Sequence, residues 1–274
     1  MLTIAGSDSG GGAGIQADLK AFARCGVHGM TAITAITAQN TVAVSGVYPL
    51  PPEAIVEQVR AVADDIGVDA VKIGMLGTAE TIAAVERALD LVGDAPVVLD
   101  PVMVAESGAR LLDEDAEDGL RTRLLPRVTV VTPNVAEARV LGGARVAGEA
   151  AGEAGARSSP GQAAAEPAPE HLARAIHRLG PGAVVVTGGH RDEATDLFFD
   201  GERLVEIPGE RHPGGASHGS GCTHSSALAA HLALGRDPLD AAREAKRIAA
   251  EAVRDGLRGL GSGAGPVNVL GLPR

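Results

Sequence analysis

Short, continuously apolar runs alternate along this chain with longer stretches in which apolar residues recur every three or four positions. The apolar runs cover residues 2–5, 30–36, 70–73, 97–99, 128–131 and 183–186. The helical pattern covers residues 15–24, 52–65, 78–91, 114–123 and 134–141. Uninterrupted apolar runs are typical of strands buried on both faces, and strand–helix alternation favours parallel βαβ units. We therefore predict an α/β fold with a mostly parallel central sheet and helices on both faces.

The C-terminal third follows another pattern. Apolar runs at 197–199 and 204–207 flank Asp200-Gly201, which predicts a hairpin. Two helices, 221–234 and 238–257, follow without a strand between them, and a glycine-rich loop covers 259–265.

Residues 144–169 lack periodicity and consist mainly of Ala, Gly, Glu, Ser and Pro, which predicts a flexible surface insertion. We expect one domain, residues 1–274, interrupted by this insertion.

Composition restricts the classes of partner. The 24 Lys and Arg residues against 35 Asp and Glu give a net charge of −11, and only 1% of residues are aromatic. A chain with neither a basic stripe nor aromatic side chains on which bases could stack is a poor candidate for nucleic-acid binding. No apolar run is long enough for a membrane span, and no basic segment marks a secretory signal. We expect a cytoplasmic protein without membrane or nucleic-acid partners, in which Cys25 and Cys222 form no disulfide framework.

The first glycine-rich segment, residues 6–14, follows the first apolar run and opens a helix. Its Gly12-x-Gly14-x-x-Ala17 pattern matches the dinucleotide-binding fingerprint. That fingerprint requires an acidic residue at the end of the second strand, but the first acid after Asp18 is Glu53. A loop whose backbone closely approaches a small substrate, with Asp8 and Asp18 nearby, is the better interpretation.

The second glycine-rich segment, Gly215-Ala216-Ser217-His218-Gly219, matches the G-x-S-x-G pattern of serine hydrolases. A nucleophile elbow needs a strand directly before it and a helix directly after its serine. Here His212-Pro213-Gly214 precedes the pattern, and these residues favour a loop. The sequence therefore argues against a serine hydrolase.

The third segment, residues 218–227, leads into an Ala-rich helix. Glycines at a helix N-terminus leave backbone N–H groups pointing outward, where the helix dipole adds partial positive charge. Gly219, Ser220 and Gly221 are thus candidates for an anion hole around a transferring phosphoryl group. Cys222, in the first turn, is expected to have a lowered pKa and to act as a thiolate base. The alternative is a glycine-rich cap with a buried cysteine. No G-x-x-x-x-G-K-[ST] motif occurs, which excludes a P-loop NTPase.

Polar residues also follow two of the predicted strands. Asn134-x-x-Glu137 is a capping box or, near phosphates, a set of ligands for Mg²⁺ or its waters. Asp100 follows residues 97–99, at the end of a strand where ligands bind in open α/β sheets, or it caps the following loop. Both interpretations stay open at this point.

Taken in order, these segments resemble the hydroxymethylpyrimidine/phosphomethylpyrimidine kinases of the ribokinase-like superfamily. The matching stretches cover nearly the whole chain except 144–169. They are residues 5–20, 37–41, 72–76, 100–104, 132–134, 188–190, 218–223 and 265–267. The resemblance implies a three-layer α/β/α fold, a homodimer, and ATP-dependent phosphorylation of a hydroxymethylpyrimidine and then of its monophosphate, with Mg²⁺.

The resemblance also assigns roles to individual residues. It implies that Cys222 is the base and that Gly219, Ser220 and Gly221 form the anion hole. Gln39 would read the aminopyrimidine, because an amide both donates and accepts hydrogen bonds. The remaining substrate-binding residues would be Gly6, Ala13, Asp18, Met75 and Val102, and the nucleotide-binding residues Asn134, Thr187 and Gly189. Asp100 and Glu137 would hold the metal.

The sequence departs from the family pattern at three places. Thr187 stands where a lysine commonly precedes Gly-Gly-His, and Arg191 is a candidate replacement for that charge. Residues 214–217 lack another lysine, and His224 replaces an aliphatic residue. Pyridoxal kinases of the same subfamily carry a second cysteine in the loop that here reads Ala105-Glu106-Ser107-Gly108, which favours the pyrimidine. A pyridoxal kinase and a weakly catalytic pyrimidine-binding protein remain the alternatives.

Overall fold

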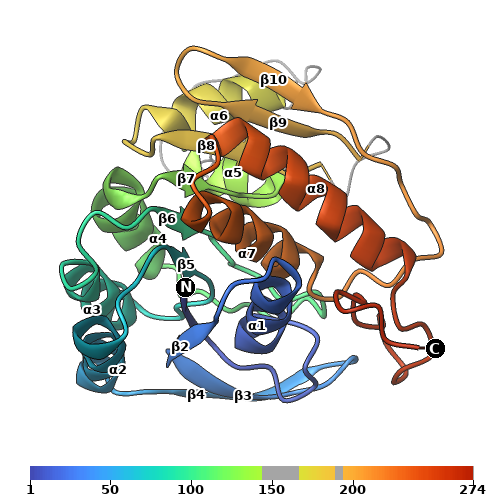
Figure 1. The fold of residues 1–274 in the computed structure, drawn as a ribbon, viewed down its shortest axis with the longest axis horizontal. Helices are drawn as coiled ribbons and strands as arrows, with labels where there is room; N and C mark the ends of the chain where they lie inside the picture. The colour runs from blue at the N-terminus through green and yellow to red at the C-terminus, as the bar shows by residue number, and fades with distance from the viewer. Residues whose placement is uncertain (144–166, 189–193, 274) are drawn as a thin grey trace, which may run out of the picture.

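An eight-stranded sheet organises the computed structural model of the chain, which describes residues 1–143, 167–188 and 194–273 (Figure 1). The strand order is β10-β9-β8-β7-β6-β5-β1-β2. The strands from β8 to β2 run parallel, whereas β9 and β10 are antiparallel to their neighbours. Their bounds are β1 Leu2–Ala5, β2 Met30–Ile33, β5 Val71–Ile73, β6 Val97–Leu99, β7 Val130–Val131, β8 Ala183–Val186, β9 Asp196–Phe199 and β10 Leu204–Ile207. The predicted mostly parallel sheet is confirmed.

Successive residues of each central strand point into two separate hydrophobic cores. In β6, Val97 and Leu99 pack into one core and Val98 packs into the other. The first core is closed by α2 Pro52–Asp65, α3 Ala79–Leu89, α4 Ala116–Gly119, α5 Val135–Leu141 and α6 Pro169–His177. The second is closed by α1 Gly14–Arg24, α7 Ser220–Ala233 and α8 Pro238–Arg254, which lie in front of the sheet in Figure 1. Burial on both faces explains why these central strands are mostly apolar, and the two exceptions, Thr3 in β1 and Lys72 in β5, both bond to Asp18.

The expected strand 30–36 is wrong in one respect, because it is two strands that belong to different sheets. The chain leaves the main sheet at Thr34, whose N–H donates to Ala5 O at 3.0 Å and whose hydroxyl donates to Met75 O at 2.8 Å. Beyond it, β3 Ala35–Gln39 pairs with β4 Val44–Pro49 as a separate hairpin. Alternating burial in β3 leaves Ile36 exposed on the outer side of this hairpin.

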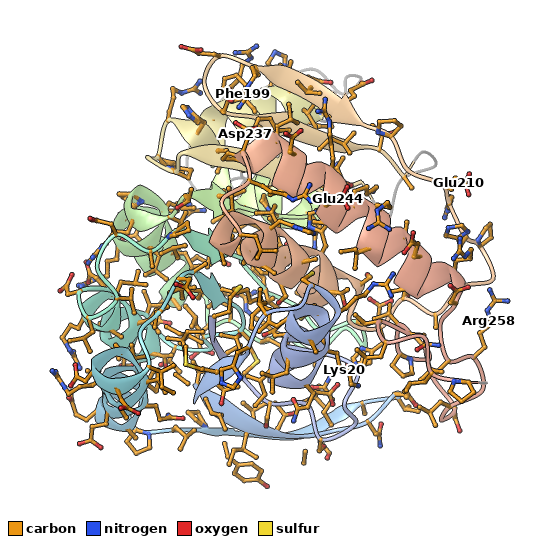
Figure 2. All side chains as sticks on the ribbon, in the orientation of Figure 1. Lys20, Phe199, Glu210, Asp237, Glu244 and Arg258 are labelled. Carbon is orange, nitrogen blue, oxygen red and sulfur yellow. The ribbon has the colours of Figure 1, made fainter. Side chains whose placement is uncertain are left out.

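Two further expectations need correction. The helix expected at 114–123 is short, because α4 ends at Gly119 and continues as a π-helical turn, Leu120–Leu124, and a 3₁₀ turn, Leu125–Arg127. The expected insertion 144–169 overlaps α6, which starts at Pro169, and its part from 144 to 166 lies outside the described residues. The C-terminal helices were placed to within a few residues, and Asp237 caps α8 by accepting from Leu239 N–H (Figure 2).

The carboxyl ends of the parallel strands meet at one edge of the sheet. Gly6 follows β1, Asp100 follows β6, and Thr132 and Thr187 follow β7 and β8. In an open α/β sheet this edge is the usual place for ligands. In the described ranges, no helix is both long and apolar enough to cross a membrane.

Candidate active site

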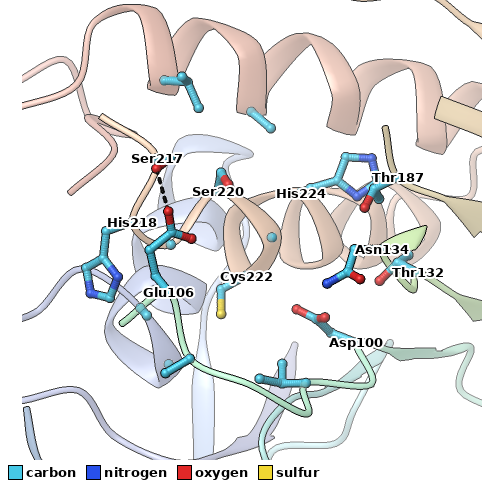
Figure 3. A pocket seen from close by; sticks show the side chains of 18 of the residues that line it. Asp100, Glu106, Thr132, Asn134, Thr187, Ser217, His218, Ser220, Cys222 and His224 are labelled. Carbon is cyan, nitrogen blue, oxygen red and sulfur yellow. Dashed lines mark hydrogen bonds between the residues drawn. The ribbon is translucent and has the colours of Figure 1, made fainter. Parts of the chain in front are cut away.

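A cavity of about 520 Å³ opens at this edge, between the strand ends and the N-terminus of α7 (Figure 3). It gathers nearly all the residues singled out from the sequence. Those lining it are Gly6, Ala13, Gln39, Met75, Asp100, Val102, Asn134, Glu137, Thr187, Gly219, Ser220, Gly221 and Cys222. Asp18 does not line it, and Gly189 and Arg191 lie outside the described residues.

The glycine-rich loop before α1 is tied together by one buried carboxylate. Asp8 accepts hydrogen bonds from the backbone N–H groups of Gly10, Gly12 and Ala13 at 2.8–3.0 Å, and His218 Nε2 lies 3.0 Å from its Oδ2. Burial alone would raise the pKa of Asp8, but these partners hold it below its ordinary value. These N–H groups of the loop thus donate to Asp8 and are not available to the pyrophosphate of a dinucleotide. This agrees with the sequence argument against a dinucleotide-binding site.

The N-terminus of α7 packs on this loop and opens into the cavity. Gly219 has φ +86°, and a Cβ there would collide with the carbonyl of Gly12, so only glycine fits. A Cβ at Gly221 would meet nothing within 4 Å, which leaves the first-turn backbone accessible. The first N–H groups of a helix have no acceptor within it, although that of Ser220 already donates to Ser217 O at 2.9 Å. This geometry suits an incoming phosphoryl group.

The expectation that the pKa of Cys222 is lowered is wrong, because the structure raises it. Its thiol lines the cavity and accepts a hydrogen bond from Gly14 N–H. Burial raises the pKa of Cys222 to about 12; the charge of Lys72 opposes this increase, and the charges of Asp100 and Asp18 add to it. Burial therefore outweighs the influence of the helix terminus on the thiol.

Asp18 is a structural anchor beneath the cavity, which corrects the expectation that it binds substrate. Its carboxylate is fully buried and accepts hydrogen bonds from the hydroxyls of Thr3 and Ser226, at 2.7 and 2.8 Å. Lys72 Nζ, equally buried, lies 2.9 Å from Asp18 Oδ1. Lys72 itself lines the cavity and was not singled out from the sequence, although it is one of only three lysines.

Asn134 and Glu137 form the capping box that their spacing predicted. Asn134 Oδ1 accepts from Glu137 N–H, and Glu137 Oε2 accepts from Asn134 N–H, both at 2.9 Å. Burial raises the pKa of Glu137 to about 8, and the charge of Asp100 adds to the effect. Burial also raises the pKa of Asp100, against the opposing influence of Lys72 and of the hydroxyl of Ser225, which donates to Asp100 Oδ2 at 3.0 Å.

The carboxylates of Asp100 and Glu137 suit a divalent cation, which would relieve their mutual repulsion. Across the part of the chain that the structure describes, no three His, Cys, Asp or Glu side chains gather closely enough to hold a metal by themselves. Mg²⁺ usually binds one or two carboxylates together with substrate phosphates and water. Asp100 and Glu137 would therefore be sufficient protein ligands for such a site.

The pyrimidine candidates lie at the opposite end of the cavity. Gln39 ends β3, and its Oε1 lies 3.3 Å from Thr37 Oγ1. Gly6 packs against the end of Met75, since a Cβ there would lie 2.7 Å from Met75 Cε. An amide beside apolar walls suits a flat, polar-edged ring.

Beyond Thr187, the cavity is lined by Asp196 and Lys246, which the sequence analysis missed, and by His224, which it noted only as a departure from the family pattern. Gly188 N–H donates to Asp196 Oδ1 at 2.9 Å, and Lys246 Nζ lies 2.6 Å from the same oxygen. His224 Nε2 lies 3.3 Å from Asp196 Oδ2. Although burial raises the pKa of Asp196, His224 and Lys246 hold it below its ordinary value. An acid at the start of an apolar strand was the only sequence signal.

Ser217 does not form a nucleophile elbow. It precedes α7 by three positions and donates its hydroxyl to Glu106 Oε1 at 2.8 Å, across the mouth of the cavity (Figure 3). The serine hydrolase interpretation is therefore excluded by its position as well as by its sequence context.

Comparisons with known proteins agree with this site. A family model described as phosphomethylpyrimidine kinase matches residues 8–268. The hydroxymethylpyrimidine/phosphomethylpyrimidine kinase of Rhizobium meliloti (strain 1021) is 48% identical over 271 residues, covering 97% of this chain and 95% of that protein. The ADP complex of pyridoxal kinase from Staphylococcus aureus superposes with a TM-score of 0.82 at 34% identity, over 98% of this chain and 92% of that one. Phosphomethylpyrimidine kinase from Clostridium difficile 630 superposes with a TM-score of 0.73 at 37% identity, over 92% of this chain and 98% of that one. With this identity over nearly its whole length, the chain belongs to the phosphomethylpyrimidine kinase family and has the ribokinase-like fold.

Proposed function

We propose that this chain uses ATP to phosphorylate 4-amino-5-hydroxymethyl-2-methylpyrimidine, and then its monophosphate, for thiamine biosynthesis. The observation that carries the proposal is the position of the α7 N-terminus. Its open first turn and Cys222 lie in the middle of one cavity, with Gln39 toward one end and Thr187 toward the other. Family membership, with relatives named for this reaction, supports the same conclusion.

The side chains divide the reaction between them. Gln39 holds the ring, with Gly6, Met75 and Val102 as walls, so that the hydroxymethyl oxygen points to the N-terminus of α7. That oxygen forms a bond to the γ-phosphorus, the bond between this phosphorus and the ADP oxygen breaks, and the hydroxyl proton passes to the Cys222 thiolate, which forms when the thiol first loses its own proton to solvent. The N–H groups of the first turn stabilise the charge on the transferring group. Neutralising Asp100 lowers the pKa of Cys222, since that charge is one cause of its increase.

Asn134 and Thr187 are the proposed nucleotide contacts, and Asp100 and Glu137 the proposed holders of Mg²⁺. A short bridge between the backbones of Asn134 and Thr187 joins the two positions. A bound Mg²⁺ would neutralise charge on the phosphates. The ADP complex of the Staphylococcus aureus relative supports a nucleotide in this fold.

The test is incubation with Mg-ATP and a panel of pyrimidine and pyridoxine alcohols, read by mass spectrometry. We expect one and then two added phosphoryl groups on the hydroxymethylpyrimidine. Phosphorylation of pyridoxal alone would establish the second candidate function, which the TM-score of 0.82 to a pyridoxal kinase favours. Pyrimidine binding without turnover would identify a weakly catalytic binding protein.

The outer side of the β3–β4 hairpin supports a homodimer of single-domain subunits spanning residues 1–274. Ile36, Val47 and Tyr48 are 51%, 42% and 64% exposed there. Exposed apolar patches of this kind mark contact sites, and a second copy offers the same patch in return. We expect a molar mass twice that of the 27.5 kDa chain in light scattering, and a monomer for Tyr48→Asp.

A further inference from the structure

The end of the cavity beyond Thr187 contains buried polar atoms that the protein leaves without hydrogen bonds. His224 is 4% exposed, and its Nδ1 has no hydrogen-bond or ion-pair partner within the described residues. Its Nε2 lies 3.3 Å from Asp196 Oδ2, an ion-pair contact, and neither of these two atoms makes a hydrogen bond there. Leaving buried polar groups without hydrogen bonds destabilises a fold, so their persistence in a cavity wall points to a ligand.

The charges around His224 come from three elements. Asp196 begins β9, Lys246 projects from α8, and Asp100 follows β6. Lys246 already pairs with Asp196 Oδ1 at 2.6 Å, so the carboxylate does not need the imidazole for neutralisation. The ring therefore keeps hydrogen-bonding capacity for something that enters the cavity.

We propose that His224 binds the polyphosphate of the nucleotide, donating a ring N–H to a phosphate oxygen while Asp196 orients the ring. The inference rests on the proposed function, since it needs ATP at this end of the cavity. A neutral imidazole donates through one nitrogen and an imidazolium through both, so either form supplies the bond. The anion fits because His224 and Lys246 place two donor side chains around a single carboxylate.

The same geometry disfavours other ligands for this end. Gly188 N–H and Lys246 both donate toward the site, and Asp196 accepts from them, so donors outnumber acceptors there. Thr187 adds a hydroxyl on the cavity wall directly before Gly188. A ligand rich in acceptors, as a polyphosphate is, satisfies this set better than an amine or an apolar ring.

The test compares His224→Leu with wild type for binding of ATP, ADP and adenosine by calorimetry, and for the KM values of ATP and of the pyrimidine. We expect ATP and ADP to bind about 10- to 100-fold more weakly, which corresponds to one hydrogen bond to a charged group. Adenosine binding and the pyrimidine KM should stay unchanged. His224→Gln, which keeps an N–H donor of similar reach, should lose less.

His231→Leu is the matched control. His231 lies on the same helix, is 8% exposed, and also has two unpartnered ring nitrogens, but it does not line the cavity. It should leave ATP affinity unchanged. In the His224→Leu background, Thr187→Lys should restore ATP affinity, because it returns a donor to the adjoining cavity wall. If His224→Leu does not fold, His224→Gln alone still gives the ATP-to-adenosine comparison.

Three outcomes would overturn the inference. Equal ATP affinity in wild type and His224→Leu would show that the ring contacts no phosphate. An equal loss for ATP and adenosine would assign His224 to the shape of the pocket. A wild-type protein that turns over the pyrimidine rules out failure of the proposed function, whereas a wild type that binds no ATP overturns both.

Discussion

The two ends of the cavity differ in how completely the protein bonds its own polar groups. At the end near the glycine-rich loop, Asp8 and Asp18 each accept at least three hydrogen bonds or ion pairs from the protein. At the other end, the ring nitrogens of His224 and one oxygen of Asp196 make no hydrogen bond among the described residues, and His224 Nε2 and Asp196 Oδ2 form only an ion-pair contact at 3.3 Å. The end near the glycine-rich loop thus bonds its own polar groups, whereas the other end keeps polar atoms that a ligand can bond. A closed, preformed wall suits recognition of a small ring, whereas open donors suit an exchangeable, highly charged nucleotide.

Cys222 lies between the two ends, and its removal should give the largest effect. Cys222→Ser keeps the shape of the side chain but changes the group that receives the proton. General-base assistance contributes typically 10²–10⁴ in rate, so we expect kcat to fall by about that factor with little change in the KM for the pyrimidine. Steady-state kinetics checks this, with Cys25→Ser, the other cysteine, as the control. Equal turnover in Cys222→Ser and wild type would reduce Cys222 to a packing residue.

The raised pKa of Cys222 gives a pH dependence in the ligand-free protein. Below a pKa of about 12, the thiolate fraction grows tenfold for each unit of pH. In a Cys25→Ser background, the rate of alkylation by iodoacetamide should therefore rise by about 1000-fold between pH 7 and pH 10, followed by mass spectrometry. A rate that levels off near pH 8 would mean that the helix terminus outweighs burial of the thiol after all.

Breaking the bonded end should destabilise the whole protein. Lys72→Met leaves the buried Asp18 carboxylate without its cation, and removing one partner of a buried pair costs about 3–5 kcal/mol. Urea denaturation should show this loss in the free energy of unfolding. Lys20→Met is the matched control, because Lys20 (Figure 2) is half-buried and, among the described residues, donates only to Gly11 O. A loss below 1 kcal/mol for Lys72→Met would contradict the view that this end depends on its internal bonds.

Ring recognition gives a smaller effect, confined to one substrate. Gln39→Ala removes an amide that pairs with the pyrimidine edge, and an unpaired polar edge in the cavity costs about 1–3 kcal/mol. We expect the pyrimidine KM to rise by about 5- to 150-fold while the KM for ATP is unchanged. An unchanged pyrimidine KM would exclude Gln39 as the residue that reads the ring.

The sequence predicted regular elements best where local signals agree. Residues 52–65 and 183–186 match α2 and β8 to the residue, since a proline at the first turn or an unbroken apolar run marks each. The split at Thr34 was missed, because the bonds that turn the chain there come from Ala5 and Met75. Local apolarity alone predicts a single strand over residues 30–36.

The site residues could be predicted by motif, but their electrostatics could not. Glycine spacing located the N-terminus of α7, and the Asn134–Glu137 spacing gave its capping box. The pKa of Cys222 depends instead on burial and on the charges of Lys72, Asp100 and Asp18, which are distant in the chain. Likewise, Asp18 turns inward because Lys72, 54 residues later, neutralises it. Long-range pairing of charges has no signature in a single sequence.

The smallest effect is expected from deleting residues 147–165, which lie outside the described residues. The deleted stretch has no periodic apolar face, and shortening a surface loop changes the closure entropy by well under about 1 kcal/mol. The elements on either side are already adjacent, because a Cβ at Gly142, at the end of α5, would lie 3.4 Å from Leu172 Cδ2 in α6. We therefore expect kcat, both KM values and the molar mass to stay as in wild type. Thermal melting and light scattering check this, with an equal-length Gly/Ser replacement as the control that separates sequence from length. A fall in melting temperature in both variants would show that side chains of this segment pack on the sheet domain, and a fall in the deletion alone would show that its length is needed to join α5 to α6.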